Sequence, residues 1–140
     1  MEENGVVRSH NGAYDGTVSV LHVKGYLDTT AARELDHIIE AQFAAQRYHI
    51  IVDLDEVEYV SSVGWGVFLG NIRTACAGGG ELKLARMRPE VYEVYRVLEF
   101  DWFVQAHETL EEAVAAFSPP LDATNLNAEA VVTALPPSFQ

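Results

Sequence analysis

The chain has 140 residues, of which 49% are apolar and 21% are charged, so it is long and apolar enough to fold as one domain around a hydrophobic core. Nine basic and 21 acidic residues give a net charge of −12, which argues against nucleic-acid binding and against adhesion to anionic membranes, because both need basic surface. The single cysteine, Cys76, excludes an intramolecular disulfide, and the acidic N-terminus and short apolar stretches predict a cytoplasmic protein without a signal peptide or a membrane span.

The first part of the chain predicts two strands, a helix and a third strand. Residues 6–8 and the β-branched run at residues 18–23 are expected to form strands. Residues 28–30 (Asp-Thr-Thr) offer three good N-cap side chains, and the apolar spacing after them predicts a helix over residues 30–46. The short apolar run at residues 49–54 is typical of a central buried strand.

The middle of the chain predicts a loop followed by a second helix. The loop runs through residues 58–60 and reaches Ser61 and Ser62. The apolar residues that follow lie on one helical stripe: Trp65, Phe68, Leu69, Ile72 and Cys76. This helix is expected to end near Ala77, because three consecutive glycines follow it.

The remaining elements continue the alternation of strands and helices. Residues 81–85 predict a strand, Pro89 is well placed in the first turn of a third helix, and residues 102–104 predict a last short strand. A capping box at residues 109–112 opens a final helix that runs through residue 117. Strands that alternate with helices indicate an α/β fold with a largely parallel sheet and right-handed crossovers.

The C-terminal residues 118–140 differ in composition from the rest of the chain. They hold four of the five prolines and no basic residue. We therefore expect one domain over residues 1–117, and a proline-bracketed tail over residues 118–140 that lies outside the core.

The sequence lacks the motifs of common cofactor and metal sites. The glycines from Gly64 to Gly70 are spaced one residue too far apart for a dinucleotide fingerprint, and Trp65 would obstruct a pyrophosphate. The five histidines are scattered without metal-ligand spacing. Asp53 and Asp55 could form a carboxylate pair, but no base, nucleophile or metal motif accompanies them, which favours turn-forming or capping acids. We therefore expect no cofactor, no metal and no enzymatic activity.

Ser61 and Ser62 allow two compatible interpretations. One of the two hydroxyls is expected to cap the helix that follows, because serine is a preferred N-cap residue. A hydroxyl at the start of a helix is also a good place for a phosphate, since the free backbone N–H groups and the positive end of the helix dipole stabilise an added anion. The residues by themselves leave both interpretations open.

Three segments carry more specific information: residues 25–28 (Gly-Tyr-Leu-Asp), the strand at residues 50–54, and the serine–glycine segment at residues 57–70. Further matches are residues 79–84, 89–91 and 110–113. Together, and in this order, they resemble the STAS domain of bacterial anti-sigma factor antagonists over about residues 5–117. The resemblance implies the STAS fold, a mixed and mostly parallel β-sheet with about four α-helices packed mainly on one face. The family's usual glycine after the third helix is absent, and Glu99-Phe100-Asp101 stands there.

In this family the serine–glycine segment usually reads Asp-Ser-Ser/Thr-Gly-Leu-Gly, and a partner kinase phosphorylates the serine that follows the aspartate. Gly64 and Gly66 match the two glycines, so the resemblance places the phosphorylation site at Ser62, with Ser61 as the runner-up. Ser61 stands in place of the family's aspartate, and Trp65 replaces the usual leucine.

The resemblance implies a non-enzymatic switch in transcription regulation. Unphosphorylated, the protein would bind a serine kinase that is also the anti-sigma factor, and so release a sigma factor. Phosphorylation of Ser62 would weaken this binding, because it adds negative charge to an already acidic protein, and a serine phosphatase would reset the switch. The two glycines would let the partner backbone approach closely. The residues expected to contact the partner are Asp28, Ser61, Gly64, Trp65 and Gly66.

A second hypothesis is a non-phosphorylated STAS adaptor subunit of a transport or stress-sensing complex. Trp65, expected on an exposed turn, would then be the docking anchor. Under either hypothesis the protein is expected to be a monomer or weak dimer, with no nucleic-acid partner and no membrane insertion. A kinase or phosphatase gene beside this one would favour the switch, and a transporter operon would favour the adaptor.

Overall fold

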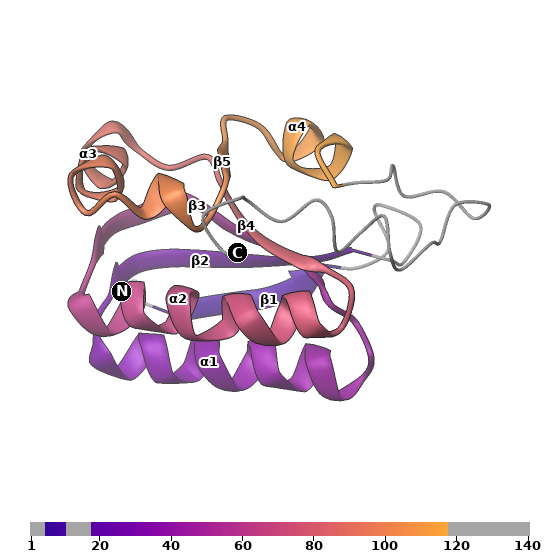
Figure 1. Cartoon of the computed structure of the whole chain (residues 1–140). Helices are drawn as coiled ribbons and strands as arrows, with labels where there is room; N and C mark the ends of the chain where they lie inside the picture. Colours follow the sequence, from indigo (N-terminus) through magenta and orange to yellow (C-terminus); the bar gives the residue numbers. More distant parts are fainter. Residues whose placement is uncertain (1–4, 11–17, 118–140) are drawn as a thin grey trace.

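A computed structural model describes residues 5–10 and 18–117 of the chain. Its centre is a five-stranded sheet in the order β1-β2-β3-β4-β5 (Figure 1). Strand β1 pairs antiparallel with β2, and the pairs from β2 to β5 are all parallel. The strands are β1 (Gly5–His10), β2 (Ser19–Leu27), β3 (His49–Val60), β4 (Glu81–Ala85) and β5 (Ala106–His107).

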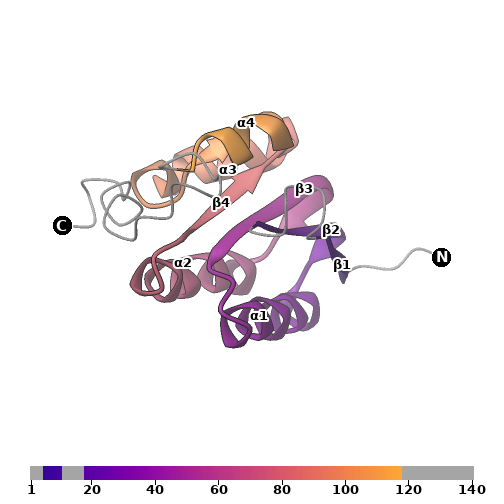
Figure 2. The same ribbon diagram turned by 90° about the vertical axis from the view of Figure 1, so that its right-hand side faces the viewer.

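The helices follow the strands in the alternating order that the sequence predicts, which confirms the α/β fold class and the mostly parallel sheet. Helices α1 and α2 lie side by side on one face of the sheet, and α4 lies on the other (Figures 1 and 2). A 3₁₀ turn, η2, follows α3. The bounds are α1 (Thr29–Ala44), α2 (Ser62–Ala77), α3 (Pro89–Val97), η2 (Phe100–Trp102) and α4 (Leu110–Ala115).

Two hydrophobic clusters cover the two faces of the sheet. The larger lies under α1 and α2 and also takes in Val91 and Tyr95 of α3 and Phe100 of η2. The smaller lies under α4 and consists of Val18, Val20, Ile51, Ala85, Ala113 and Phe117. Because side chains in a strand point alternately to opposite faces, neighbours such as Ile50 and Ile51 serve different clusters.

Two strand boundaries differ from the sequence prediction. Strand β3 does not give way to a loop at residues 58–60 but continues to Val60, because Val60 pairs with Leu27 across two register shifts in the β2–β3 ladder. Strand β2 likewise continues through Gly25, whose φ of 85° suits glycine and coincides with the second of these shifts.

The strand predicted at residues 102–104 is wrong. That stretch begins inside η2, and the strand that pairs with β4 is Ala106–His107. Burial of Phe100 and a hydrogen bond from the Tyr95 hydroxyl to the Val104 carbonyl hold the chain in a turn against α3.

The predicted tail, residues 118–140, lies outside the described residues, and its separation from the domain stays a prediction. A chain ending at Ser118 is expected to remain soluble and to unfold cooperatively, because residues 18–117 already contain both hydrophobic clusters. Thermal unfolding followed by circular dichroism would check this, with a midpoint expected within a few degrees of the full chain. Loss of soluble protein would show that the tail completes the core.

Candidate partner-binding site

The starts of α1 and α2 lie next to each other at the carboxyl edge of the sheet. Strands β2 and β3 are parallel neighbours, and the Ser61 backbone N–H donates to the Leu27 carbonyl at 3.0 Å. The Asp28 carboxylate accepts a hydrogen bond from the Ala31 N–H at 2.9 Å and so caps α1. The structure therefore brings the predicted contact residues Asp28 and Ser61 together, and both are helix caps.

The two adjacent serines have different environments. The Ser61 hydroxyl accepts a hydrogen bond from the Gly64 N–H at 3.1 Å, so Ser61 is the N-cap of α2 and is half-buried. Ser62 is the first residue of the helix and is exposed. The predicted arrangement of strand, cap and helix start is confirmed, and the identity of a phosphorylated serine stays a prediction.

The two matched glycines also differ. Gly64 is buried, and a β-carbon there would lie 2.8 Å from Val60 Cγ1 and 3.0 Å from Leu27 Cδ2. Its lack of a side chain therefore serves packing between the helix start and the strand ends. Gly66 is exposed, and a β-carbon there would meet no atom of residues 5–10 or 18–117 within 4 Å. A close approach by a partner backbone thus remains an expectation for Gly66 and does not suit Gly64.

The exposed position expected for Trp65 is wrong. Its side chain is only 4% exposed and packs against Phe68 and Phe100, with ring centroids 5.7 and 4.9 Å away. Phe100 follows Glu99, which adopts a left-handed φ of 61° at the place where the family has glycine. Trp65 is a core residue and cannot serve as a docking anchor in this conformation. Its place on the predicted apolar stripe was the signal that pointed to burial.

An exposed aromatic pair, which no sequence motif predicted, lies at the same edge. Tyr26 and Tyr59 are 51% and 52% exposed, and their ring centroids lie 6.1 Å apart. Each stands two residues before a helix cap, Asp28 or Ser61, and this repeated spacing could have identified them. Large exposed aromatic rings are common anchors of protein interfaces.

A shallow groove of about 500 Å³ lies between α1 and α2, and its lining includes Val63, the residue after Ser62. Asp36 and Glu40 of α1 form one wall, and Val63 and Gly66 of α2 belong to the other. The Asn71 side-chain amide donates to the Asp36 carboxylate at 2.8 Å, which ties the two helices together. The groove brings acidic and small apolar side chains together on the surface between the two helices, and it reaches the start of α2 only at Val63.

The carboxylate pair considered at Asp53 and Asp55 is not a reactive pair. Asp53 is 3% exposed and accepts two hydrogen bonds from the Arg86 guanidinium, at 3.0 and 2.8 Å, while Asp55 is exposed. His22 Nδ1 lies 2.6 Å from the same carboxylate. Burial raises the pKa of Asp53, but hydrogen bonds from Arg86, the Asp55 N–H and His22 outweigh it and hold the pKa below its usual range. Asp53 therefore fixes the strand ends in place.

Replacing Asp53 with asparagine is expected to cost about 1.5–3 kcal/mol of unfolding free energy at pH 7, because it removes charge-assisted hydrogen bonds to a buried carboxylate. A lowered folded-state pKa stabilises the protein above the unfolded pKa of about 3.9 and loses that effect as the pH falls. The gap between the wild type and Asp53→Asn should therefore shrink below about pH 4 in urea denaturation curves. Asp55→Asn is the matched control. A pH-independent gap would contradict the assignment.

Neither a metal site nor a membrane span is found in the part of the chain that the structure describes. No three His, Cys, Asp or Glu side chains within residues 5–10 and 18–117 are grouped so that they could hold a metal ion. No helix among these residues is both long and apolar enough to cross a bilayer.

Comparison with known proteins agrees with this architecture. The chain is 28% identical over 99 residues to BtrV of Bordetella bronchiseptica, which is named as an anti-sigma factor antagonist, and the match covers 71% of this chain and 85% of BtrV. A crystal structure of an anti-sigma factor antagonist from Mycobacterium paratuberculosis superposes with a TM-score of 0.67 at 24% identity, covering 81% of this chain and 92% of that one.

The phosphorylated form of SpoIIAA, a cell fate determinant of Bacillus, has the same fold. It superposes with a TM-score of 0.59 at 20% identity, covering 80% of this chain and 96% of that one. The family model of the STAS domain matches residues 10–113, which is most of the chain and spans both helix starts of the site. This chain therefore belongs to the STAS domain family.

Proposed function

We propose that this protein is an anti-sigma factor antagonist that binds a serine-kinase anti-sigma factor when Ser62 is unmodified and loses affinity when Ser62 is phosphorylated. The names of BtrV and of the superposed Mycobacterium structure support the general function. SpoIIAA, with the same fold, is known in a phosphorylated form, which supports a switch by phosphorylation. The proposed site of action is the cytoplasm, where the protein acts by binding and not by catalysis.

The observation that carries the proposal is the contrast between the two serines at the start of α2. The Ser61 hydroxyl is engaged in the helix cap, whereas Ser62 is exposed at the first helical position. Backbone N–H groups in the first turn of a helix lack intrahelical acceptors, so a phosphate on Ser62 would be placed beside donors and the positive end of the helix dipole. The site can thus accept a phosphoryl group without losing its cap.

The partner would meet one continuous edge of the molecule. Asp28, Ser62 and Gly66 lie at or next to the paired helix starts, and the exposed rings of Tyr26 and Tyr59 flank them. Before transfer, a kinase must hold the phosphates of its nucleotide close to the Ser62 hydroxyl. After transfer, the phosphoserine carries about −1.5 to −2 charges and faces the remaining nucleotide phosphates, so repulsion weakens the complex. A serine phosphatase would restore binding.

Burial of Trp65 removes the residue that supported an adaptor role. The adaptor was expected to dock through an exposed tryptophan, and Trp65 instead packs on Phe68 and Phe100. The adaptor hypothesis now predicts one distinct result, which is a stable complex in which neither serine is ever modified.

The proposal is tested by incubating the 140-residue chain with ATP and a serine-kinase anti-sigma factor from the same organism. Intact-mass measurement is expected to show the addition of one phosphoryl group, and calorimetry should show weaker kinase binding after the modification than before. A complex that forms without any mass change would contradict the switch and favour the adaptor.

A further inference from the structure

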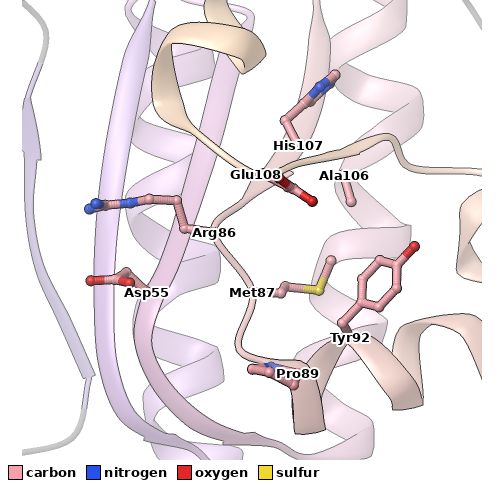
Figure 3. Close-up of a pocket in the computed structure, with 8 residues that line it drawn as sticks. All are labelled: Asp55, Arg86, Met87, Pro89, Tyr92, Ala106, His107 and Glu108. Atoms are coloured by element: carbon pink, nitrogen blue, oxygen red, sulfur yellow. The ribbon is translucent and has the colours of Figure 1, made fainter.

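A second concave site lies between the end of β4, the start of α3 and β5 (Figure 3). Its volume is about 590 Å³, which is in the range of small-molecule pockets. The apolar part of its wall is formed by Met87, Pro89, Tyr92 and Ala106. None of the proposed kinase-binding residues lines this pocket, so kinase binding does not account for it.

The pocket wall is held in place by packing. Met87 and Ala106 pack against the larger hydrophobic cluster. The Tyr92 ring stacks on Tyr95, with ring centroids 5.6 Å apart and planes inclined by 30°, and Tyr95 is itself buried. Tyr92 thus presents a supported aromatic surface to the pocket, and no rearrangement of the core is needed to admit a ligand.

The ionisable groups around the pocket leave its rim negative. The Arg86 side chain points away from Met87 and Tyr92 (Figure 3) and is engaged by the Asp53 carboxylate at 3.0 and 2.8 Å. Burial, together with the positive charge of Lys83, lowers the pKa of His107 and so favours the neutral form of its ring. Glu108 is exposed and its carboxylate points toward the side of the pocket where Met87 lies (Figure 3).

Glu108 makes none of the ion pairs found among the described residues. Its carboxylate is therefore available to a ligand at the rim of an apolar wall. In a protein with a net charge of −12, cations are also attracted from a distance.

We propose that this pocket binds an organic cation with an apolar stem, namely an alkyl guanidinium or alkyl ammonium group. The stem packs on Met87 and Pro89, the cationic head pairs with the Glu108 carboxylate, and the Tyr92 ring contributes a cation–π contact. The same chemistry is offered by an arginine or lysine side chain of a bound protein and by a free amine or guanidine. The assignment does not depend on phosphorylation of Ser62.

The test uses two probes of nearly equal shape and different charge. N-acetyl-arginine methylamide and its neutral analogue N-acetyl-citrulline methylamide are titrated into ¹⁵N-labelled full-length protein. The arginine probe is expected to shift the amide signals of Met87, Tyr92 and Glu108 with a saturable, millimolar Kd, and the citrulline probe is expected to cause no saturable shift. Equal shifts with both probes would overturn the proposal.

Two variants test whether the arginine probe binds at Glu108 itself or is attracted only by the net negative charge of the protein. Glu108→Gln is expected to weaken binding of the arginine probe by about tenfold or more, as the loss of a charge-assisted hydrogen bond implies. Glu34→Gln, on the exposed side of α1, makes the same change in net charge and should leave the Kd unchanged. Equal weakening by both variants would show only a general attraction of cations to an acidic protein and would overturn the site.

A further comparison distinguishes the source of the cation. Agmatine carries the guanidinium and stem without a peptide backbone, and a Gly-Gly-Arg-Gly-Gly peptide carries both. Tighter binding of the peptide assigns the pocket to a basic side chain of a protein partner, whereas tighter binding of agmatine assigns it to a free organic cation. Failure of both to bind would overturn the proposal.

Discussion

Replacing Ser62 with alanine is expected to abolish phosphorylation by the partner kinase while the complex with the unmodified protein still forms. Ser62 is exposed and its hydroxyl does not cap α2, so its loss removes the proposed acceptor without disturbing the helix start. Ser62→Asp is expected to weaken kinase binding partially, since one carboxylate carries less charge and fewer oxygens than a phosphate. Intact mass after incubation with ATP, and calorimetric titration with the kinase, measure the two effects.

Ser61→Ala is the matched control. It is expected to change the stability of the protein and not its phosphorylation site. It removes the hydrogen bond that Ser61 accepts from the Gly64 N–H, so it should lower the unfolding free energy by about 1 kcal/mol. The variant should still accept one phosphoryl group, more slowly if the position of the helix start affects transfer. If Ser61→Ala loses the modification and Ser62→Ala keeps it, the alignment of the motif is wrong by one residue.

The helix starts could be predicted from the sequence because capping is local chemistry. Asp28, Ser61 and Thr109 each accept a hydrogen bond from the N–H three residues ahead, at 2.9, 3.1 and 3.0 Å. Each cap therefore depends on a stretch of only four residues, which a reader of the sequence can recognise without knowing the fold. The candidate site could be located for the same reason, since it is built on two of these caps.

What the sequence could not show depends on contacts between distant segments. Strand β3 reaches Val60 because Leu27 of a neighbouring strand pairs with it, and the sequence around residues 58–60 contains no sign of that pairing. The burial of Asp53 is compatible with its charge because Arg86, from another strand end, neutralises it. Propensity and periodicity describe single segments, so they miss partners that the fold supplies.

Trp65 is the clearest example of such a contact, because its environment is completed by Phe100 from η2. Trp65→Ala is expected to lower the unfolding free energy by about 3–5 kcal/mol, the usual cost of truncating a large buried aromatic side chain. Trp102→Ala is the matched control: Trp102 is 59% exposed, and its loss should cost less than about 1 kcal/mol. Urea denaturation followed by far-UV circular dichroism is the appropriate measurement, since both variants alter tryptophan fluorescence.

Two milder variants keep this prediction testable if Trp65→Ala does not fold. Trp65→Leu introduces the residue usual in the family and leaves part of the space beside Phe100 empty, so its loss of stability should lie between those of the alanine variant and the wild type. Trp65→Phe keeps an aromatic ring and removes the indole N–H, which is buried and has no hydrogen-bond partner among the described residues, so it should cost least of the three. Two results would contradict this assignment: a Trp65→Leu variant as stable as the wild type, or a Trp102→Ala variant as destabilised as Trp65→Ala. Either would show that packing of the Trp65 side chain on Phe100 does not hold α2 and η2 together.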